Sequence, residues 1–534
     1  MKKICGFSVP CFVVLCSWLM AAQVPHSVTT YQYDNNHSGA NTNETILTPT
    51  NVNVSQFGRL TVFPVQGYVY AQPLYVPNLS ISGTAHNVLF VATEHDQVYA
   101  FDVNSGQQLW HTNFLSDSGP LLVISTVLPS DVNCQDLVPE IGITGTPVIN
   151  VMTNTLYVSA ETKKYNPRTQ TTVFYHTLHA LDIRTGLDQV PPHNIAGSAP
   201  GNGGGSIDGF ITFNSKLANQ RPSLLLADDQ LFVSFSSHCD LGTYHGWIMS
   251  FNQTSLAPNG VLIDTPNGFE GGIWGSGSGP AADASGSIYV ATGNGWFDAN
   301  TGGNDYGDSV LRLTWSGSGF SVADYFTPWD QVYLDDNDLD VNSGGVVLLP
   351  DQTGATYPHL LMQAGKEGTI DLINRDNMGH WNSGNDDQIV QTLPFAIGGM
   401  YGGPAFWNNN AYFGGIYDHL KAFAFNPQTE LFSTTPTSES TEQFNFPGPS
   451  PVVSSNLTHT GIVWIIETDN YSNGGNAILR AYSASNLGTE LYNSQQDSGR
   501  DQMGLPVKFA VPTVADGHVF VGAQGQVAMY GLLQ

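Results

Sequence analysis

The sequence predicts an all-β protein, an eight-bladed β-propeller made of four-stranded antiparallel blades. Helical periodicity is scarce along the 534 residues, and Gly is frequent, with 57 copies. Short apolar runs bounded by Gly, Pro, Asn and Asp dominate, which is typical of β-strands joined by turns. One strand–turn unit recurs along the chain, and repetition of such units indicates propeller blades.

The recurring unit opens with a short apolar run after Pro or Gly and continues with two further strands. Its clearest copy is "VLFVATEHDQVYAFDVNSGQQLW" at 88–110, which ends in a turn and a Trp. Eight opening strands are predicted, within 72–76, 146–150, 221–226, 279–293, 344–351, 403–415, 450–455 and 511–522. Third strands follow the same pattern, as in "LHALDIRTG" and "LKAFAFNPQT". Eight openings predict eight blades.

The last unit has only three strands before the chain ends at Gln534. A fourth strand is available upstream, because "FGRLTVFPV" at 57–65 has strand character. Pairing the two ends of the chain would close the ring and limit exposed strand edges. An array of β-sandwiches and a β-helix are the alternatives to a propeller.

The first 22 residues resemble a secretory signal peptide, with Lys2 and Lys3 before an apolar stretch that ends at Ala21-Ala22. An uncleaved membrane anchor is the alternative, but the run is shorter than the roughly 20 residues that a span needs. The expected parts are the signal peptide (1–22), an N-terminal lead (23–56) and the propeller (57–534). We expect a periplasmic or secreted protein with no membrane span after cleavage.

Cleavage would leave two cysteines, Cys134 and Cys239. An oxidising compartment permits a disulfide, but the sequence leaves open whether the two meet. The 44 acidic residues against 16 Lys and Arg give a net charge of −28, which argues against nucleic acid and anionic lipid as partners.

The unit "VYAFDVNSGQQLW" resembles the docking repeat of the pyrroloquinoline quinone (PQQ) dehydrogenases, which are eight-bladed propellers that oxidise alcohols and sugars. Over about 57–534, three further segments sharpen the resemblance. "SIYVATGNGWFD" (287–298) is similar to the family strand whose Asn binds calcium, here Asn294. "GKEGTIDLINRDNMG" (365–379) is similar to the segment whose basic residue contacts the quinone, here Lys366.

The third segment is "YLDDNDLDVNSGG" (333–345), which precedes an opening strand where the family has its catalytic base. The resemblance implies Asp338 as that base, and also as a metal-site residue; a shift of one gap would make Asp340 the base instead. Two further matches imply Trp274 in "GGIWGSGSG" as the aromatic floor under the quinone and Asp240 in "SHCDLGTYHGW" as a calcium ligand. Carboxylate and amide oxygens suit calcium, and a carboxylate suits a general base.

The chain also departs from the family pattern. It has no Cys-Cys pair, an Asp replaces the metal-binding Glu, and the Trp of the Trp-Asp pair is missing. Histidines at 176, 179, 238 and 245 are expected to form hydrogen bonds between blades rather than bind a metal.

Two functions from different classes follow from the sequence. One is an exported quinoprotein-like oxidoreductase that oxidises an alcohol or sugar with PQQ and Ca²⁺. The other is a non-catalytic propeller that binds a protein or glycan partner in the envelope or outside the cell.

Overall fold

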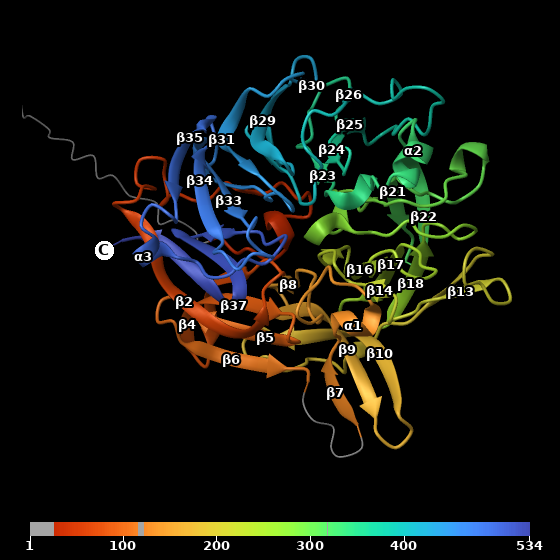
Figure 1. Ribbon diagram of the computed structural model, residues 1–534, viewed down its shortest axis with the longest axis horizontal. Helices are drawn as coiled ribbons and strands as arrows, with labels where there is room; N and C mark the ends of the chain where they lie inside the picture. The colour runs from red at the N-terminus through yellow and green to blue at the C-terminus, as the bar shows by residue number, and fades with distance from the viewer. Residues whose placement is uncertain (1–25, 116–121, 318, 534) are drawn as a thin grey trace, which may run out of the picture.

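The protein is an all-β propeller whose eight small sheets are arranged around a central axis (Figure 1). The computed structural model describes residues 26–115, 122–317 and 319–533, so the predicted signal peptide at 1–22 lies outside the described residues. All eight predicted opening strands are present, each as the first strand of one blade. Within the described ranges, no helix has the length and apolar character needed to cross a membrane.

The blades follow one another in chain order around the ring (Figure 1). The first blade consists of β3 (Leu74–Ile81), β4 (Thr84–Thr93), β5 (Gln97–Asp102) and β6 (Gln108–Asn113), and the second of β8 (Val148–Asn150), β9 (Thr155–Asn166), β10 (Thr171–Asp182) and β11 (His193–Asn194). The third blade consists of β15 (Leu225–Ala227), β16 (Gln230–Ser237), β17 (Trp247–Asn252) and β18 (Pro258–Ile263). The fourth consists of β19 (Ala281–Ala282), β20 (Ile288–Ala291), β21 (Val310–Trp315) and β22 (Phe320–Phe326). The fifth blade consists of β23 (Val347–Leu348), β24 (Leu360–Ala364), β25 (Ile370–Asn374) and β26 (Gln391–Leu393). The sixth consists of β27 (Ala405–Trp407), β28 (Asn410–Gly414), β29 (Asp418–Asn426), β30 (Leu431–Phe432) and β31 (Ser438–Phe444). The seventh consists of β32 (Val452–Asn456), β33 (His459–Glu467), β34 (Ile478–Ser483) and β35 (Asn486–Asn493).

The eighth blade joins the two ends of the chain, as the sequence predicts. β36 (Thr513–Ala515) and β37 (His518–Leu532) come from the C-terminal end, and β2 (Phe57–Tyr68) pairs antiparallel with β37, with Phe57 opposite Leu532. β37 doubles back near Gly525, which has a φ of +71°, so that Gly531 packs against Gly517. The blade therefore holds the ring closed by backbone hydrogen bonds between distant segments.

Smaller elements decorate the blades. Short strands extend or flank the sheets: β1 (Ala40–Asn41) beside β32, β7 (Val123–Thr126) beside β9, β14 (Ala218–Asn219) beside β16, and the separate pair β12 (Ser198–Pro200) and β13 (Phe210–Thr212). The helical turns are η1 (Tyr31–Tyr33), α1 (Pro129–Val132), η2 (Gly275–Gly277), η3 (Ala299–Thr301), α2 (Gln331–Asp336), η4 (Val341–Ser343) and α3 (Ser498–Asp501).

The hydrophobic core lies between neighbouring blades, because alternate side chains of each strand face the next sheet. Separate clusters join successive blades, for example Val88 and Val98 of the first blade with Leu156 and Val158 of the second. The repeat that ends in Trp110 explains part of this docking. The Trp110 indole N–H donates to the carbonyl of Ile183 in the next blade at 2.9 Å, and its ring packs on Gly186, where a Cβ would come within 2.5 Å.

The segment 28–41 forms a plug in the central channel of the ring. It makes a hydrogen bond to the first strand of every blade, in the order in which the blades follow one another. The pairs are Val28–Tyr75, Thr29–Ile149, Asn35–Leu226, Asn35–Ala282, Asn36–Leu348, Ser38–Phe406, Gly39–Val453 and Asn41–Val514, at 2.7 to 3.0 Å. Burial of Tyr31 and Gln32 makes the plug part of the core. One end of the channel is thereby filled with protein.

Candidate functional site

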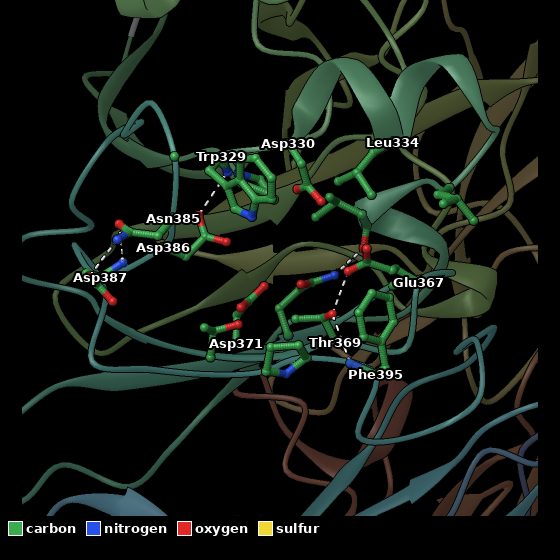
Figure 2. A pocket seen from close by; sticks show the side chains of 18 residues that line it. Trp329, Asp330, Leu334, Glu367, Thr369, Asp371, Asn385, Asp386, Asp387 and Phe395 are labelled. Atoms are coloured by element: carbon green, nitrogen blue, oxygen red, sulfur yellow. Dashed lines mark hydrogen bonds between the residues drawn. The ribbon is translucent and has the colours of Figure 1, made fainter.

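Cavities of about 250 to 330 Å³ occur at several places on the propeller, and two of them border the segment that carries Asp338 and Asp340. The larger, about 330 Å³ (Figure 2), lies against the fifth blade and includes none of the residues that the sequence implicates. The second, about 260 Å³, is lined by Asp136, Arg221, Cys239, Asp240, Trp274, Ser276, Asp340, Ser343, Lys366, Tyr401, Phe446 and Phe509. Four of the predicted site residues therefore share one cavity wall: Asp240, Trp274, Asp340 and Lys366.

The second cavity, which we call the central cavity, is made by loops from seven blades. Each lining residue lies either before the first strand of a blade or between its second and third strands. In an antiparallel blade these two connections lie at the same end of the sheet. The plug lies directly beneath, because Ser278, close to the cavity residue Ser276, has its hydroxyl 3.2 Å from His37 Nδ1. Residues far apart in sequence thus meet around one axis.

Lys366 bridges the two aspartates that are the candidate bases. Its ammonium lies 2.7 Å from Asp340 Oδ2 and 2.5 Å from Asp338 Oδ1. Burial alone would lower the pKa of Lys366, but the charges of Asp340 and Asp338 outweigh it and raise the pKa above its usual range. Lys366 is therefore charged at neutral pH, and the three side chains form one ionic unit.

The two aspartates differ in exposure. The Asp340 side chain is 7% exposed and lines the central cavity, whereas the Asp338 side chain is 70% exposed and does not line it. Asp338 adopts a left-handed backbone with φ of +55°, which turns the chain between α2 and η4. Asp340 also accepts a hydrogen bond from the Asn294 backbone N–H at 2.8 Å. Asp340 is the better-placed carboxylate for chemistry inside the cavity.

Asn294 connects the fourth blade to this ionic unit. Its amide nitrogen donates to Asp338 Oδ1 at 3.1 Å, which leaves its amide oxygen facing elsewhere. That oxygen, Oδ1, is buried and has no hydrogen-bond partner among the described residues. A buried carbonyl oxygen without a partner costs free energy, so this atom is a candidate ligand for a cation.

Asp240 contributes a third carboxylate from the loop after β16. Tyr244 donates its hydroxyl to Asp240 Oδ1 at 2.5 Å. Although the residue is solvent-accessible, surrounding atoms desolvate its carboxyl, and this burial, followed by the charges of Asp340 and Asp338, raises its pKa. Repulsion of this kind is relieved when a cation binds.

Trp274 lies against Asp340 across a glycine. A Cβ on Gly293 would come 2.3 Å from Asp340 Oδ1 and 2.9 Å from the Trp274 indole nitrogen. Only a glycine at this position lets the two side chains approach each other. The indole N–H of Trp274 is buried without a hydrogen-bond partner in the described parts of the chain, while the residue as a whole stays partly exposed.

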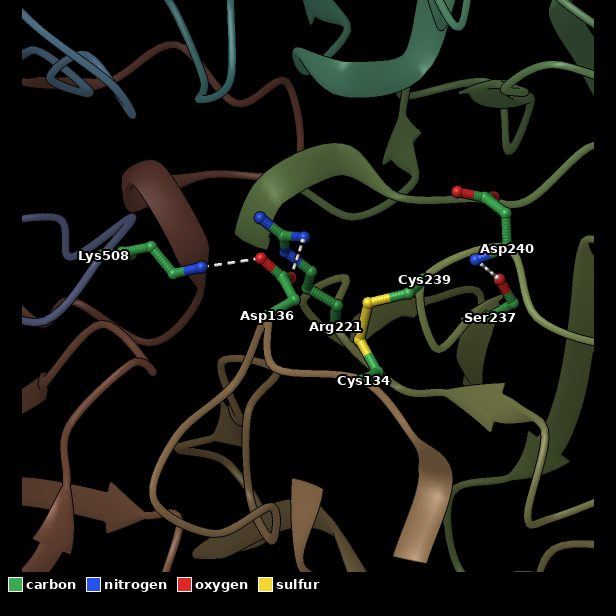
Figure 3. Close-up of a disulfide and its surroundings, with 7 residues drawn as sticks. All are labelled: Cys134, Asp136, Arg221, Ser237, Cys239, Asp240 and Lys508. Atoms are coloured by element: carbon green, nitrogen blue, oxygen red, sulfur yellow. Dashed lines mark hydrogen bonds and ion pairs between the residues drawn. A yellow bond between two sulfur atoms is a disulfide. The ribbon is translucent and has the colours of Figure 1, made fainter. Parts of the chain in front are cut away.

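The opposite wall of the central cavity carries positive charge and a disulfide, which sequence analysis did not place there. Arg221 and Lys508 both contact Asp136, at 3.0 and 2.6 Å (Figure 3). Asp136 cannot neutralise both, so this wall keeps a net positive charge. Arg221 also stacks 3.9 Å from the centre of the Phe509 ring.

Cys134 and Cys239 are joined by a disulfide, which settles the pairing that the sequence left open (Figure 3). Cys239 lies next to Asp240 and lines the cavity. The bond ties the loop of α1 in the second blade to the loop after β16 in the third, and so fixes the cavity wall. The sequence made the disulfide possible by leaving two cysteines after cleavage, but their separation of 105 positions gave no indication that they meet.

Two further acids near the ionic unit were also missed. Burial, followed by the charges of Asp335, Asp240 and Asp340, raises the pKa of Glu270 to about 7. Asp308 is fully buried, and burial followed by the charge of Asp340 raises its pKa well above the usual range. Glu270 precedes Gly271 and Asp308 follows Gly307, which are common loop sequences, so the sequence gave no reason to choose either acid as a candidate site residue.

The donor atoms fit calcium by chemistry, though no ready-made metal site is visible. In the described ranges, no three His, Cys, Asp or Glu side chains are grouped closely enough to hold a metal ion. Asp240, Asp340 and the free Oδ1 of Asn294 nevertheless offer two carboxylates and one amide oxygen, the hard ligands that calcium prefers. The Asn294 amide oxygen is the neutral ligand in this candidate set.

The histidines behave as structural groups. His176 Nε2 lies 3.1 Å from the Ala218 carbonyl in the next blade, and His238 Nε2 lies 3.5 Å from Glu161 Oε1 in the preceding blade. His245 instead bonds locally, to Thr265 and to the Gly204 carbonyl. The expected hydrogen bond between blades is made by His176. His238 lies near Glu161 without a hydrogen bond between them, His179 pairs with Asp188 of its own blade, and His245 bonds locally.

Known structures with a similar fold include two quinohemoprotein alcohol dehydrogenases. The quinohemoprotein alcohol dehydrogenase ADHIIG from Pseudomonas putida HK5 superposes with a TM-score of 0.59 at 12% identity, over 95% of this chain and 80% of that one. The quinohemoprotein alcohol dehydrogenase from Comamonas testosteroni gives 0.55 at 14% identity, over 96% and 81%. No family model and no curated sequence matches the chain. The chain thus has the propeller fold of the quinoprotein alcohol dehydrogenases.

Proposed function

We propose that the protein is an exported PQQ- and calcium-dependent dehydrogenase that oxidises an alcohol or a sugar. The observation that carries this proposal is the composition of the central cavity. Its wall combines an aromatic face with a buried carboxylate paired with a lysine, and the Asn294 amide, whose oxygen has no partner among the described residues, lies against that carboxylate through its own backbone N–H.

The residues fit an anionic planar quinone. Trp274 offers an aromatic surface for stacking. Arg221, Lys366 and Lys508 bring three cations to and around the cavity in a chain with only 16 Lys and Arg, and these charges offset those of the lining residues Asp136, Asp240 and Asp340. Asp240, Asp340 and Asn294 Oδ1 would hold calcium. When bound, PQQ would supply the hydride acceptor and calcium would polarise it.

Within this site Asp340 is proposed as the general base. It would accept the proton of the substrate hydroxyl, for which its position in the cavity wall is suitable. Lys366 would hold the carboxylate in place and compensate its charge. Asp338, which is mostly exposed, would orient Lys366 and the Asn294 amide from outside the cavity. This assigns to Asp340 the role that the family resemblance gave first to Asp338.

Export is supported by the Cys134–Cys239 disulfide, because such bonds persist in oxidising compartments. The site of action is therefore proposed to be the periplasm or the extracellular space, consistent with the predicted signal peptide.

The test is dye-linked oxidation of a panel of alcohols and sugars by the purified protein, with added PQQ and Ca²⁺. Wild-type protein should turn over at least one substrate. Asp340→Asn should lower kcat by about 10²- to 10⁴-fold, the usual contribution of a general base, while PQQ stays bound. The matched control is Asp336→Asn, an exposed aspartate of the same segment, which should leave kcat unchanged.

Two outcomes would change the proposal. If Asp338→Asn abolishes turnover and Asp340→Asn does not, Asp338 is the base. If wild-type protein binds no PQQ at micromolar concentration, the dehydrogenase proposal fails and the non-catalytic propeller that binds a protein or glycan takes its place.

A further inference from the structure

The larger cavity of about 330 Å³, which is also lined by Leu339 and Val341 on either side of Asp340, contains five carboxylates in its wall (Figure 2). The carboxylates are Asp330, Glu367, Asp371, Asp386 and Asp387. Among the described residues that line it, none is Lys, Arg or His. A concave site with this charge and no internal cation attracts a positively charged ligand. We call it the acidic cavity.

The buried carboxylate of Asp371 distinguishes the acidic cavity from an ordinary cluster of solvent-exposed acidic residues. It lies in β25 opposite Thr392 of β26, and the residue is only 4% exposed. Its Oδ1 is buried and has no hydrogen-bond partner among the described residues. Evolution seldom retains a buried carboxylate oxygen without a partner unless a ligand or a proton satisfies it.

Three of the other carboxylates already accept hydrogen bonds, whereas the buried Asp371 Oδ1 has no partner among the described residues. Asp386 Oδ1 accepts from the Trp329 backbone N–H at 2.9 Å, and Asp387 Oδ2 accepts from the Asn385 amide at 2.6 Å. Glu367 accepts from the Thr369 hydroxyl at 2.5 Å. These bonds hold the carboxylates around the cavity without neutralising them.

The remaining walls are apolar or aromatic. Leu334 of α2 and Val341 of η4 line the cavity and are buried. Trp329 and Phe395 line it as well and are 47% and 71% exposed. Aromatic faces bind organic cations favourably, and apolar walls suit a chain of methylene groups.

A bare metal ion fits these observations less well. In the described parts of the chain, no three His, Cys, Asp or Glu side chains are close enough to hold one. The carboxylates are spread around a volume far larger than one ion occupies. A neutral sugar would leave the ionised carboxylates of the cavity without a counter-ion.

We propose that the acidic cavity binds a linear aliphatic amine, whose ammonium group pairs with Asp371 and whose methylene chain lies along Leu334 and Val341 between Trp329 and Phe395. This site is separate from the central cavity and does not depend on the proposed dehydrogenase activity.

Binding is coupled to proton release. Burial, followed by the charge of Asp386, raises the pKa of Asp371 to about 8; Thr392 lowers it, and Glu367 and Asp330 raise it further. Asp371 is therefore mostly protonated at pH 7, and the ammonium ion, whose own pKa is about 10, favours its ionised form. Affinity should rise with pH, approaching tenfold per pH unit below pH 8.

The experiment is isothermal titration calorimetry of putrescine into the full-length protein at pH 8.0 and low salt, with 1,4-butanediol as the neutral analogue. One putrescine should bind per chain and butanediol should not. Asp371→Asn should weaken binding by about tenfold or more, the loss expected for a charged hydrogen bond, and should abolish the pH dependence. The matched control, Asp208→Asn on an exposed loop, should bind putrescine like the wild type.

Two further variants control for misfolding of the protein and for binding of putrescine in the central cavity. Phe395→Ala, at an exposed position, should fold normally and weaken putrescine binding several-fold. Trp274→Ala should leave it unchanged, because Trp274 belongs to the central cavity. The proposal is overturned if putrescine does not bind, if butanediol binds equally well, or if Ca²⁺ displaces putrescine stoichiometrically from the wild type but not from Asp371→Asn.

Discussion

Replacing Lys366 by Met tests the ionic unit most sharply. The substitution removes the ammonium that lies 2.7 Å from Asp340 and also contacts Asp338, while it keeps a side chain of similar length. The Asp340 side chain is only 7% exposed, so its carboxylate would be left buried and unpaired. Removing one partner of a buried pair costs about 3 to 5 kcal/mol.

The corresponding shift in melting temperature can be estimated. Unfolding entropy is about 2.1 cal/mol/K per residue, so a folded chain of about 500 residues has about 1 kcal/mol/K, and a loss of about 3 kcal/mol lowers Tm by about 3 °C. Asp338→Asn should cost about 1 kcal/mol or less, because its side chain is 70% exposed. The two aspartates should therefore respond very differently to the loss of Lys366.

The assay is differential scanning calorimetry at pH 7 on a double-mutant cycle. Lys366→Met should lower Tm by about 3 °C, and adding Asp340→Asn to it should restore most of the loss. Adding Asp338→Asn instead should restore little. Equal rescue by the two aspartate variants, or no rescue by Asp340→Asn, would refute the view that Asp340 is the buried partner.

Three other predictions follow from separate parts of the fold. Cys134→Ser should destabilise the protein by about 4 to 5 kcal/mol, since the bond to Cys239 closes a loop of 105 positions; an unchanged melting temperature in calorimetry would contradict this. Burial raises the pKa of Glu94 to about 8, so the folded state binds the extra proton and stability falls as the pH rises from about 4.5 to 8; Glu94→Gln should raise Tm at pH 8.5 and leave it unchanged at pH 5. Gly39→Ala should lower Tm measurably, since its φ is +68° and the new Cβ would come 2.7 Å from Ala405; circular-dichroism melting decides, and a neutral result would show that the plug is not tightly held.

Much of the fold could be predicted because its signals are local. Each blade opens with a short apolar run after Pro or Gly. The strands and the turn that lead to Trp110 lie in one contiguous stretch of sequence, 88–110. The closing strand at 57–65 was predictable because it has strand character and the last unit lacks a strand. These features depend on near neighbours in the chain.

The plug, the cationic cluster at Asp136 and the assignment of Asp340 depend on contacts between residues far apart in the chain, and such contacts cannot be predicted from local patterns in a single sequence. The plug binds the blades mainly through backbone groups of residues 28–41, so its side chains carry no recognisable pattern. Arg221 and Lys508 meet at Asp136 from positions far apart in the chain, and nothing in their local sequence marks them. The exchange of roles between Asp338 and Asp340 depends on burial, which spacing alone could not assign.

The central claim is that the loops of seven blades form a single quinone-binding cavity. Its most direct test is a titration of PQQ, followed by quenching of tryptophan fluorescence, with and without Ca²⁺. We predict saturable binding of one PQQ per chain, weakened at least about tenfold in Trp274→Ala, and a calcium effect that disappears in Asn294→Ala. Absence of saturable binding, or identical titrations for the wild type and both variants, would contradict the claim.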